Sequence, residues 1–102
     1  MADISEARNN LERRILDGNG NASPSDRRAA FNNGGLDGPA GALADKVARH
    51  AYRVTDDDIT AARMSGLSED QLFEIVVCAA VGQATRQYNS ALAALEAAMG
   101  KG

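Results

Sequence analysis

What the sequence has little of narrows the classes of protein that it can encode. Its 102 residues include one cysteine, Cys78, so no disulfide can form within the chain. The aromatic residues are two Phe and two Tyr, with no Trp, and the basic residues form no stripe. Proteins that bind nucleic acid gather basic side chains on one face and stack bases on aromatic rings. We therefore expect no nucleic-acid partner.

Long apolar runs are also missing. No run reaches the roughly 20 residues that a helix needs to cross a bilayer. The opening residues, MADISEARNNLERRI, lack the apolar core of a signal peptide. A free thiol fits a reducing compartment. We expect a soluble, cytoplasmic protein with no membrane partner.

The motifs that hold metals or phosphate groups are absent as well. The single histidine, His50, lies too far in sequence from the single cysteine to suggest a zinc site. The acids of residues 56–58 lack the Asp-x-Asp-x-Asp-Gly spacing of a calcium loop. The glycine-containing segment 18–21 follows a predicted helix and has no lysine, unlike a phosphate-binding loop. We expect neither a metal nor a cofactor.

The pattern of apolar residues indicates an all-α fold. No segment alternates apolar and polar residues as a strand does, and no repeat of 20 to 50 residues is present. Capping residues and glycine-rich stops divide the chain into helices, which we predict over residues 3–17, 24–31, 40–53, 56–65 and 68–99. The length fits a single domain. Within it, residues 1–38 form a helical arm with a glycine-rich loop, and residues 39–102 form the helical core.

The last predicted helix, residues 68–99, dominates the sequence. Ser68 can cap it, with Gln71 three residues on, and no proline interrupts it. From Leu72 to Val81 nearly every residue is apolar, and Glu74 is the one exception. A helix that is apolar all round must be covered all round, which a chain of this length can hardly do alone. We therefore predict a homo-oligomer that assembles through its long helices.

Part of the chain resembles the carboxymuconolactone decarboxylase / alkylhydroperoxidase D-like (AhpD-like) superfamily. The resemblance is carried by the string VTDDDITAARMSGLSEDQLFEIVVCAAVG, residues 54–82. In that family a helix ends in Ala-Gly, and a long Ala-rich helix then opens with Ser/Asp-Glu-x-hydrophobic-x-Glu. The corresponding features here are Ser65-Gly66, then Ser68-Glu69 and the embedded Glu74. The resemblance, over roughly residues 40–99, implies an AhpD-like helical domain that forms homo-oligomers, with a related AhpD-like protein as a second candidate partner.

The chain departs from the family at the position of the peroxidase chemistry. Peroxidase members carry Cys-x-x-Cys-x-x-x-His on the helix before the Ala-Gly turn. Residues 43–65 occupy that place here and contain His50 but no cysteine. The resemblance therefore implies a short member without the dithiol chemistry, and it leaves open whether the protein is an enzyme.

Glu74 is the first candidate catalytic residue, because it is the only charge between Asp70 and Arg86. A desolvated carboxylate has a raised pKa, which suits proton transfer. Glu74 would then act as acid or base in a pocket between subunits, in a decarboxylase- or peroxidase-like enzyme. By family analogy alone, the substrate would be a small carbonyl compound or lactone-like acid. The alternative, which we favour, is a structural acid paired with an arginine or a helix N-terminus.

Cys78, one helical turn after Glu74, is the second candidate, for peroxide reduction through a single thiol. That role needs a lowered thiol pKa and access to solvent. No cation lies near Cys78 in sequence, and a neighbouring carboxylate would raise the pKa of the thiol. We favour an inert thiol in the core.

Gly82 and Arg86 are the predicted interface residues. Gly82 lies among alanines, which would allow a second helix to approach closely. Arg86 would meet Glu74 of an antiparallel partner helix in a charge pair that fixes the register of the contact. We therefore expect the subunit contact near this point of the long helix.

Overall fold

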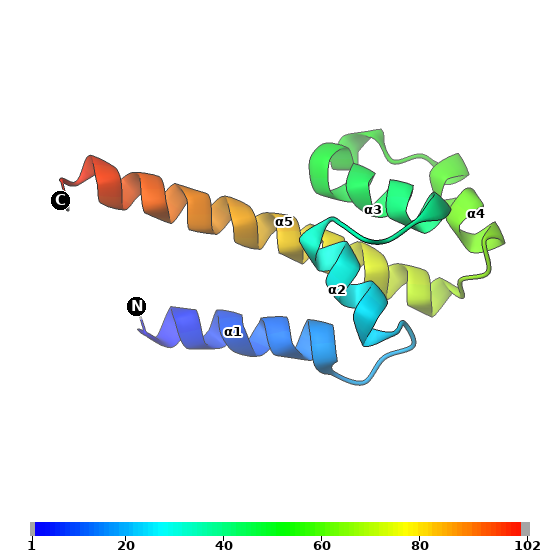
Figure 1. Ribbon diagram of the computed structural model, residues 1–102, viewed down its shortest axis with the longest axis horizontal. Coiled ribbons are helices and arrows are strands. Elements are labelled where there is room, and N and C mark those ends of the chain that lie inside the picture. The colour runs from blue at the N-terminus through cyan, green and yellow to red at the C-terminus, as the bar shows by residue number, and fades with distance from the viewer. Residues whose placement is uncertain (1, 101–102) are drawn as a thin grey trace.

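The computed structural model describes the backbone of residues 2–100 and the side chains from Glu6 to Gly100. These residues form five α-helices and one 3-10 turn, which are arranged as in Figure 1. They are α1 (Ala2–Asp17), α2 (Pro24–Asn32), α3 (Gly38–His50), η1 (Ala51–Arg53), α4 (Asp56–Met64) and α5 (Glu69–Ala98). No strand occurs over residues 2–100. The predicted all-α fold with a long C-terminal helix is confirmed.

Capping residues set the start of the last two helices. At α5, the Ser68 hydroxyl accepts a hydrogen bond from the Gln71 backbone N–H, and the Gln71 side chain accepts one from the Ser68 backbone N–H. At α4, Thr55 and Asp58 exchange the same pair of bonds. These reciprocal bonds satisfy N–H groups that a helix leaves without partners in its first turn.

The core lies where α2 and α3 pack against the first half of α5. One cluster of buried side chains joins α2, α3 and α5, and a smaller one joins α3, α4 and α5. The first contains Ala22, Ala30, Ala44, Ile75, Cys78 and Ala79, and the second contains Leu43, Ala62 and Leu72. Because most of these side chains are small, the helices can approach one another closely. Ala22 and Ala30 belong to the predicted arm, so the arm contributes to the core.

The closest helix approach occurs at Gly82. A Cβ atom at this position would overlap the backbone carbonyl oxygen of Phe31 in α2. Arg86, one turn later, donates a hydrogen bond to the same carbonyl oxygen and another to Gln83. The sequence placed Gly82 and Arg86 at a contact between subunits. In the structure, the close approach at Gly82 is made to α2 of the same chain.

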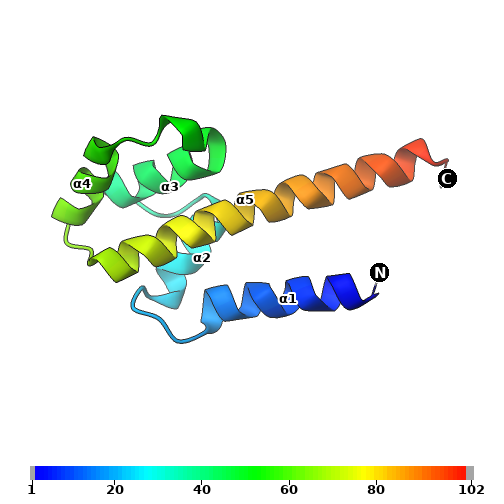
Figure 2. The same ribbon diagram turned by 180° about the vertical axis from the view of Figure 1, so that it is seen from behind.

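The second half of α5 extends beyond the core, and α1 runs alongside it in the opposite direction (Figures 1 and 2). Arg8 connects the two helices, because its guanidinium lies 4.6 Å from the centre of the Tyr88 ring and donates to Asn89 at 3.1 Å. Near the end of the extension, Leu95 and Met99 are 55% and 70% exposed. The molecule is accordingly elongated, with extents of 51 × 29 × 20 Å.

The chain covers only one side of the apolar first half of α5. Leu72 and Ile75 are buried, together with Cys78 and Ala79. Phe73 is 68% exposed, Val76 and Val77 are half-buried, and Ala80 is exposed. Because removing apolar surface from water is favourable, leaving this side of α5 in water is unfavourable. Among the helices described, none is long and apolar enough to cross a membrane.

Candidate functional site

Glu74 is held by the loop that joins α1 to α2. Its Oε1 atom accepts hydrogen bonds from the backbone N–H groups of Asn21 and Ala22, at 2.9 Å and 2.8 Å. Its Oε2 atom lies 2.9 Å from the same Asn21 nitrogen. The carboxylate therefore ties α5 to the segment that leads into α2.

Gly20 makes room for this carboxylate. A Cβ atom at Gly20 would lie 2.7 Å from Oε1 of Glu74 and 3.3 Å from the guanidinium of Arg27. A side chain at this position would therefore displace the Glu74 carboxylate from its present place against the loop. The sequence marked residues 18–21 only as a helix stop, because a loop that binds a distant side chain through its backbone has no residue signature.

Arg27 is the charged residue that sequence reasoning missed. It is only 4% exposed, and its Nη1 atom donates to the carbonyl oxygens of Ile15 and Gly18, at 3.1 Å and 2.9 Å. Its guanidinium therefore satisfies carbonyl groups at the end of α1. Its positive charge also lowers the pKa of Glu74. One signal was available in the sequence. Arg27 precedes the apolar Ala30 and Phe31 by three and four residues, which places all three on one side of α2.

These surroundings overturn the expected pKa of Glu74. Hydrogen bonds from the backbone of Asn21 and then Ala22 lower the pKa of this carboxyl below its ordinary value of 4.5. Burial works in the opposite direction, and the charge of Arg27 lowers the pKa further. The prediction of a raised pKa was wrong because the fold supplies hydrogen-bond donors that the sequence did not reveal. An ionised carboxylate with its oxygens occupied is suited to anchoring the loop rather than to donating a proton.

Cys78 lies beneath Glu74 in the core. The side chain is 1% exposed, and its Sγ atom lies 3.8 Å from the carbonyl oxygen of Ile15. Burial is the main reason that the pKa of the thiol is raised, and the Glu74 charge raises it further, while Arg27 opposes both. The predicted burial is confirmed. A buried thiol with a raised pKa lacks the thiolate and the access that peroxide reduction needs.

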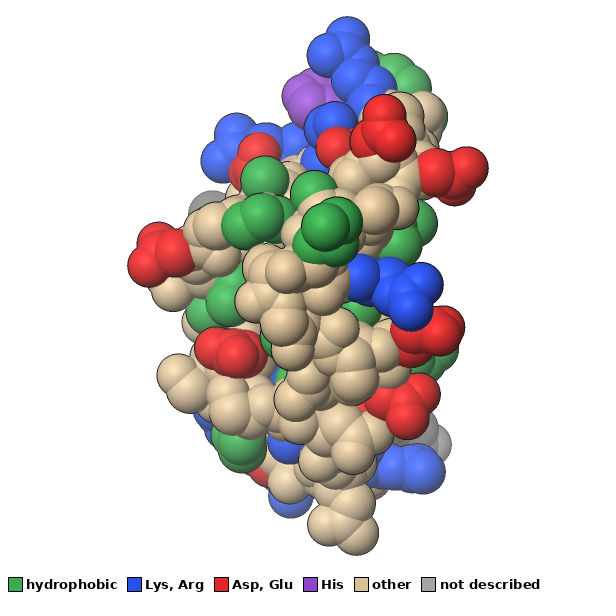
Figure 3. All heavy atoms as spheres, turned by 90° about the vertical axis from the view of Figure 1, so that its right-hand side faces the viewer, with side chains coloured by type: hydrophobic (Ala, Val, Ile, Leu, Met, Phe, Trp, Pro, Cys, Tyr) green, Lys and Arg blue, Asp and Glu red, His purple; other side chains and the backbone are tan. Residues whose placement is uncertain are grey.

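Two hollows flank the exposed Phe73. A cavity of about 170 Å³ lies on one side and is lined by Phe73, Val77, Glu74, Arg14, Asn19 and Cys78, among others. A larger one of about 440 Å³ lies on the other side and is lined by Ile59, Arg63, Glu69, Asp70, Leu72, Phe73 and Val76. Figure 3, which views the end of the molecule where α4 meets α5, shows hydrophobic side chains among charged ones. Phe73 is therefore a projecting side chain between two recesses.

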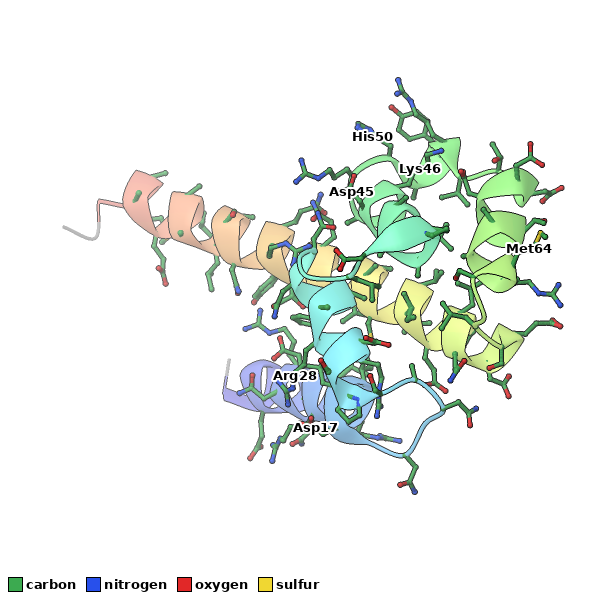
Figure 4. All side chains as sticks on the ribbon, turned by 45° about the vertical axis from the view of Figure 1, so that its right-hand side comes forward. Asp17, Arg28, Asp45, Lys46, His50 and Met64 are labelled. Atoms are coloured by element: carbon green, nitrogen blue, oxygen red, sulfur yellow. The ribbon has the colours of Figure 1, made fainter. Side chains whose placement is uncertain are left out.

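His50 lies apart from Glu74 and Cys78. It is exposed at the end of α3, as Figure 4 shows, and its ring packs edge-on against Tyr52 at 6.0 Å. The same view shows Met64 of α4 pointing outward and the paired side chains of Asp17 and Arg28 joining α1 to α2. Within residues 6–100, no group of three or more His, Cys, Asp or Glu side chains is placed to hold a metal ion.

Comparison with known proteins supplies no relative for this arrangement. No family model, no curated protein and no solved structure matches the chain.

Proposed function

We propose that the protein is a homo-oligomeric helical module of the AhpD-like kind that lacks the dithiol peroxidase chemistry. The observation that carries this proposal is the uncovered apolar side of α5, where Phe73 is 68% exposed beside Val76 and Val77. Burying one large apolar side chain contributes about 1.5–3 kcal/mol. A second chain placed on this side would recover that free energy.

The contacts of the candidate catalytic residues support a module without chemistry of its own. Glu74 holds the loop before α2, and Cys78 fills the core beneath it. No contact of Glu74 favours the alternative of an acid or base in a decarboxylase- or peroxidase-like enzyme. A related AhpD-like protein is a second candidate partner on the same surface, and the single free thiol favours a cytoplasmic setting.

The mass of the protein in solution tests this proposal. We expect sedimentation velocity to show species heavier than the 10.7 kDa chain, in a proportion that rises with concentration. Phe73→Glu should shift the protein to the monomer, because it places a charge on the apolar surface.

Tyr52→Glu is the matched control, because Tyr52 is an aromatic residue of η1 that is 80% exposed. It should leave the mass distribution unchanged. Circular dichroism should show both variants to be as helical as the parent. A folded parent that remains a monomer at every concentration would contradict the proposal.

A further inference from the structure

The outer side of α5 carries a regular pattern of residues. Steps of four and three residues lead from Phe73 through Val77, Ala80, Ala84, Gln87, Ala91 and Ala94 to Ala98. We call these positions the seam. Alternating spacings of four and three define the a and d positions of a coiled coil, in which one helix packs along another. Seven of the eight positions are apolar, and Gln87 is the exception.

The structure leaves almost all of the seam open. Val77 is half-buried and the other seam residues are exposed. The core contacts of α5 come from Ile75, Cys78, Ala79 and Gly82, which lie on the opposite side of the helix at about 100° per residue. α1 contacts α5 at Tyr88 and Asn89, which are not seam positions. Among the side chains of residues 6–100, seven of the eight seam residues are therefore exposed, and Val77 is partly covered.

We infer that the seam packs against the seam of a second copy of this chain, with the two α5 helices antiparallel. The inference rests on the proposed homo-oligomer and specifies its contact. A two-fold contact of this kind uses the same surface on both copies.

The sizes of the seam residues favour the antiparallel arrangement. Phe73 and Val77 lie at one end of the seam, and Ala94 and Ala98 lie at the other. Antiparallel packing sets large side chains against small ones, so the helix axes stay evenly spaced. Parallel packing would set Phe73 against Phe73 and alanine against alanine, which would force the axes apart at one end.

The charges favour the same orientation. Glu69 and Asp70 occupy the first turn of α5, and its last turn has no basic residue. A parallel pair would bring these acids of both copies together, which is unfavourable.

Full overlap of the two seams fixes one register. It pairs Phe73 with Ala98, Val77 with Ala94, Ala80 with Ala91, and Ala84 with Gln87. Gln87 then lies next to the two-fold axis in both copies, where the two side-chain amides can hydrogen-bond to each other. A single polar residue in an apolar seam specifies register and orientation in coiled coils.

The same register fills the hollow beside Phe73 and Val77. Leu95 and Met99 are exposed near the end of α5. In this register, the second copy places its own Leu95 and Met99 beside the hollow. The seam itself spans about 38 Å at 1.5 Å per residue, and a helix is about 10 Å wide. The overlap then covers on the order of 400 Å² per copy in plan, less than a standard interface. We therefore expect a reversible dimer that depends on concentration.

Disulfide cross-linking tests the orientation and the register. In a Cys78→Ala background, one copy carries Ala80→Cys and a second, of different mass, carries Ala91→Cys. Mild oxidation of the mixture should give the mixed 80–91 dimer as the main product, because paired seam positions approach within disulfide distance. Each variant alone should cross-link weakly. Ala93→Cys, exposed on the opposite side of α5, should give no mixed dimer with Ala80→Cys.

The outcomes separate this inference from the proposed function. Dominant 80–80 and 91–91 disulfides would show a parallel pair and overturn the inference. A background variant that sediments as an oligomer but gives no 80–91 product would overturn the inference and leave the proposed oligomer standing. A folded monomer would overturn both.

A charge at the axis gives an independent test in the chain that retains Cys78. Gln87→Lys sets two like charges together in the dimer, and we expect the dissociation constant to rise at least about tenfold. Ser90→Lys, at an exposed position off the seam, should leave the dissociation constant unchanged. Equal effects of the two variants would overturn the inference.

Discussion

At the scale of one residue, Glu74 is the only charge in an apolar run, and it anchors a loop. Its carboxylate accepts N–H groups from Asn21 and Ala22. We predict that Glu74→Gln lowers the free energy of unfolding by about 1.5–3 kcal/mol, because a hydrogen bond to a charged group contributes about that much. Urea denaturation measures the change. Glu69→Gln, which removes an exposed carboxylate from the same helix, should cost less than about 1 kcal/mol.

The pH dependence of stability follows from the direction of the Glu74 pKa. The fold holds this pKa below the ordinary value of 4.5, so the unfolded chain takes up the proton first as pH falls. The stabilisation by Glu74 is therefore complete above that value and is lost as pH falls through the folded pKa. Below pH 4.5 the Glu74→Gln variant should lose stability less steeply than the parent. Parallel curves for the two proteins would contradict the anchoring role.

Of this site, the sequence identified Glu74 but not the groups that surround it. Glu74 was conspicuous because no other charge lies near it on the helix. Its hydrogen-bond donors lie 52 and 53 residues away and belong to the backbone. No side-chain type in the sequence therefore indicates them. Arg27 did not stand out because acids and other basic residues surround it in sequence. The donors also decided the sign of the pKa shift, which is why burial alone gave the wrong direction.

At the scale of the helices, local signals predicted the boundaries well. The long helix was expected over residues 68–99 and runs from Glu69 to Ala98, because its capping box is a short-range feature. The helix expected over residues 40–53 begins at Gly38 and ends at His50, where the chain tightens into the 3-10 turn η1. Such turns are common at helix ends and have little signature of their own.

The contact between α2 and α5 gives a prediction at the same scale. Gly82→Ala should destabilise the fold by about 1–3 kcal/mol, because the added methyl group meets the Phe31 carbonyl and α2 must shift. Alanine is the better helix former by about 1 kcal/mol, so a loss of stability would show that the contact outweighs propensity. Gly34→Ala, where the added atom meets nothing within 4 Å, should change stability by less than about 0.5 kcal/mol. A more stable Gly82→Ala variant would mean that α2 is not held at this distance.

At the scale of the whole molecule, residues 72–81 were expected to be more apolar than one chain can cover. The chain buries one side of this stretch and leaves Phe73 exposed, and the second chain that would cover the other side stays a prediction. Periodicity identifies which residues are apolar, but it does not say which neighbour covers each side. The close approach predicted at Gly82 is present, but the helix that approaches is α2 of the same chain. Contacts between distant parts of the chain depend on loop geometry, which local patterns leave open.

The antiparallel pairing of whole molecules predicts a reciprocal effect of two seam residues. It sets Phe73 of one copy against Ala98 of the other, so Phe73→Ala should weaken the dimer because less apolar surface is buried. Ala98→Phe should also weaken it, because Phe73 then meets a second large side chain. The double variant again sets a small side chain against a large one, and it should recover most of the lost affinity in sedimentation equilibrium. Additive losses in the double variant would mean that these two residues do not meet, and that the seams pair in another orientation.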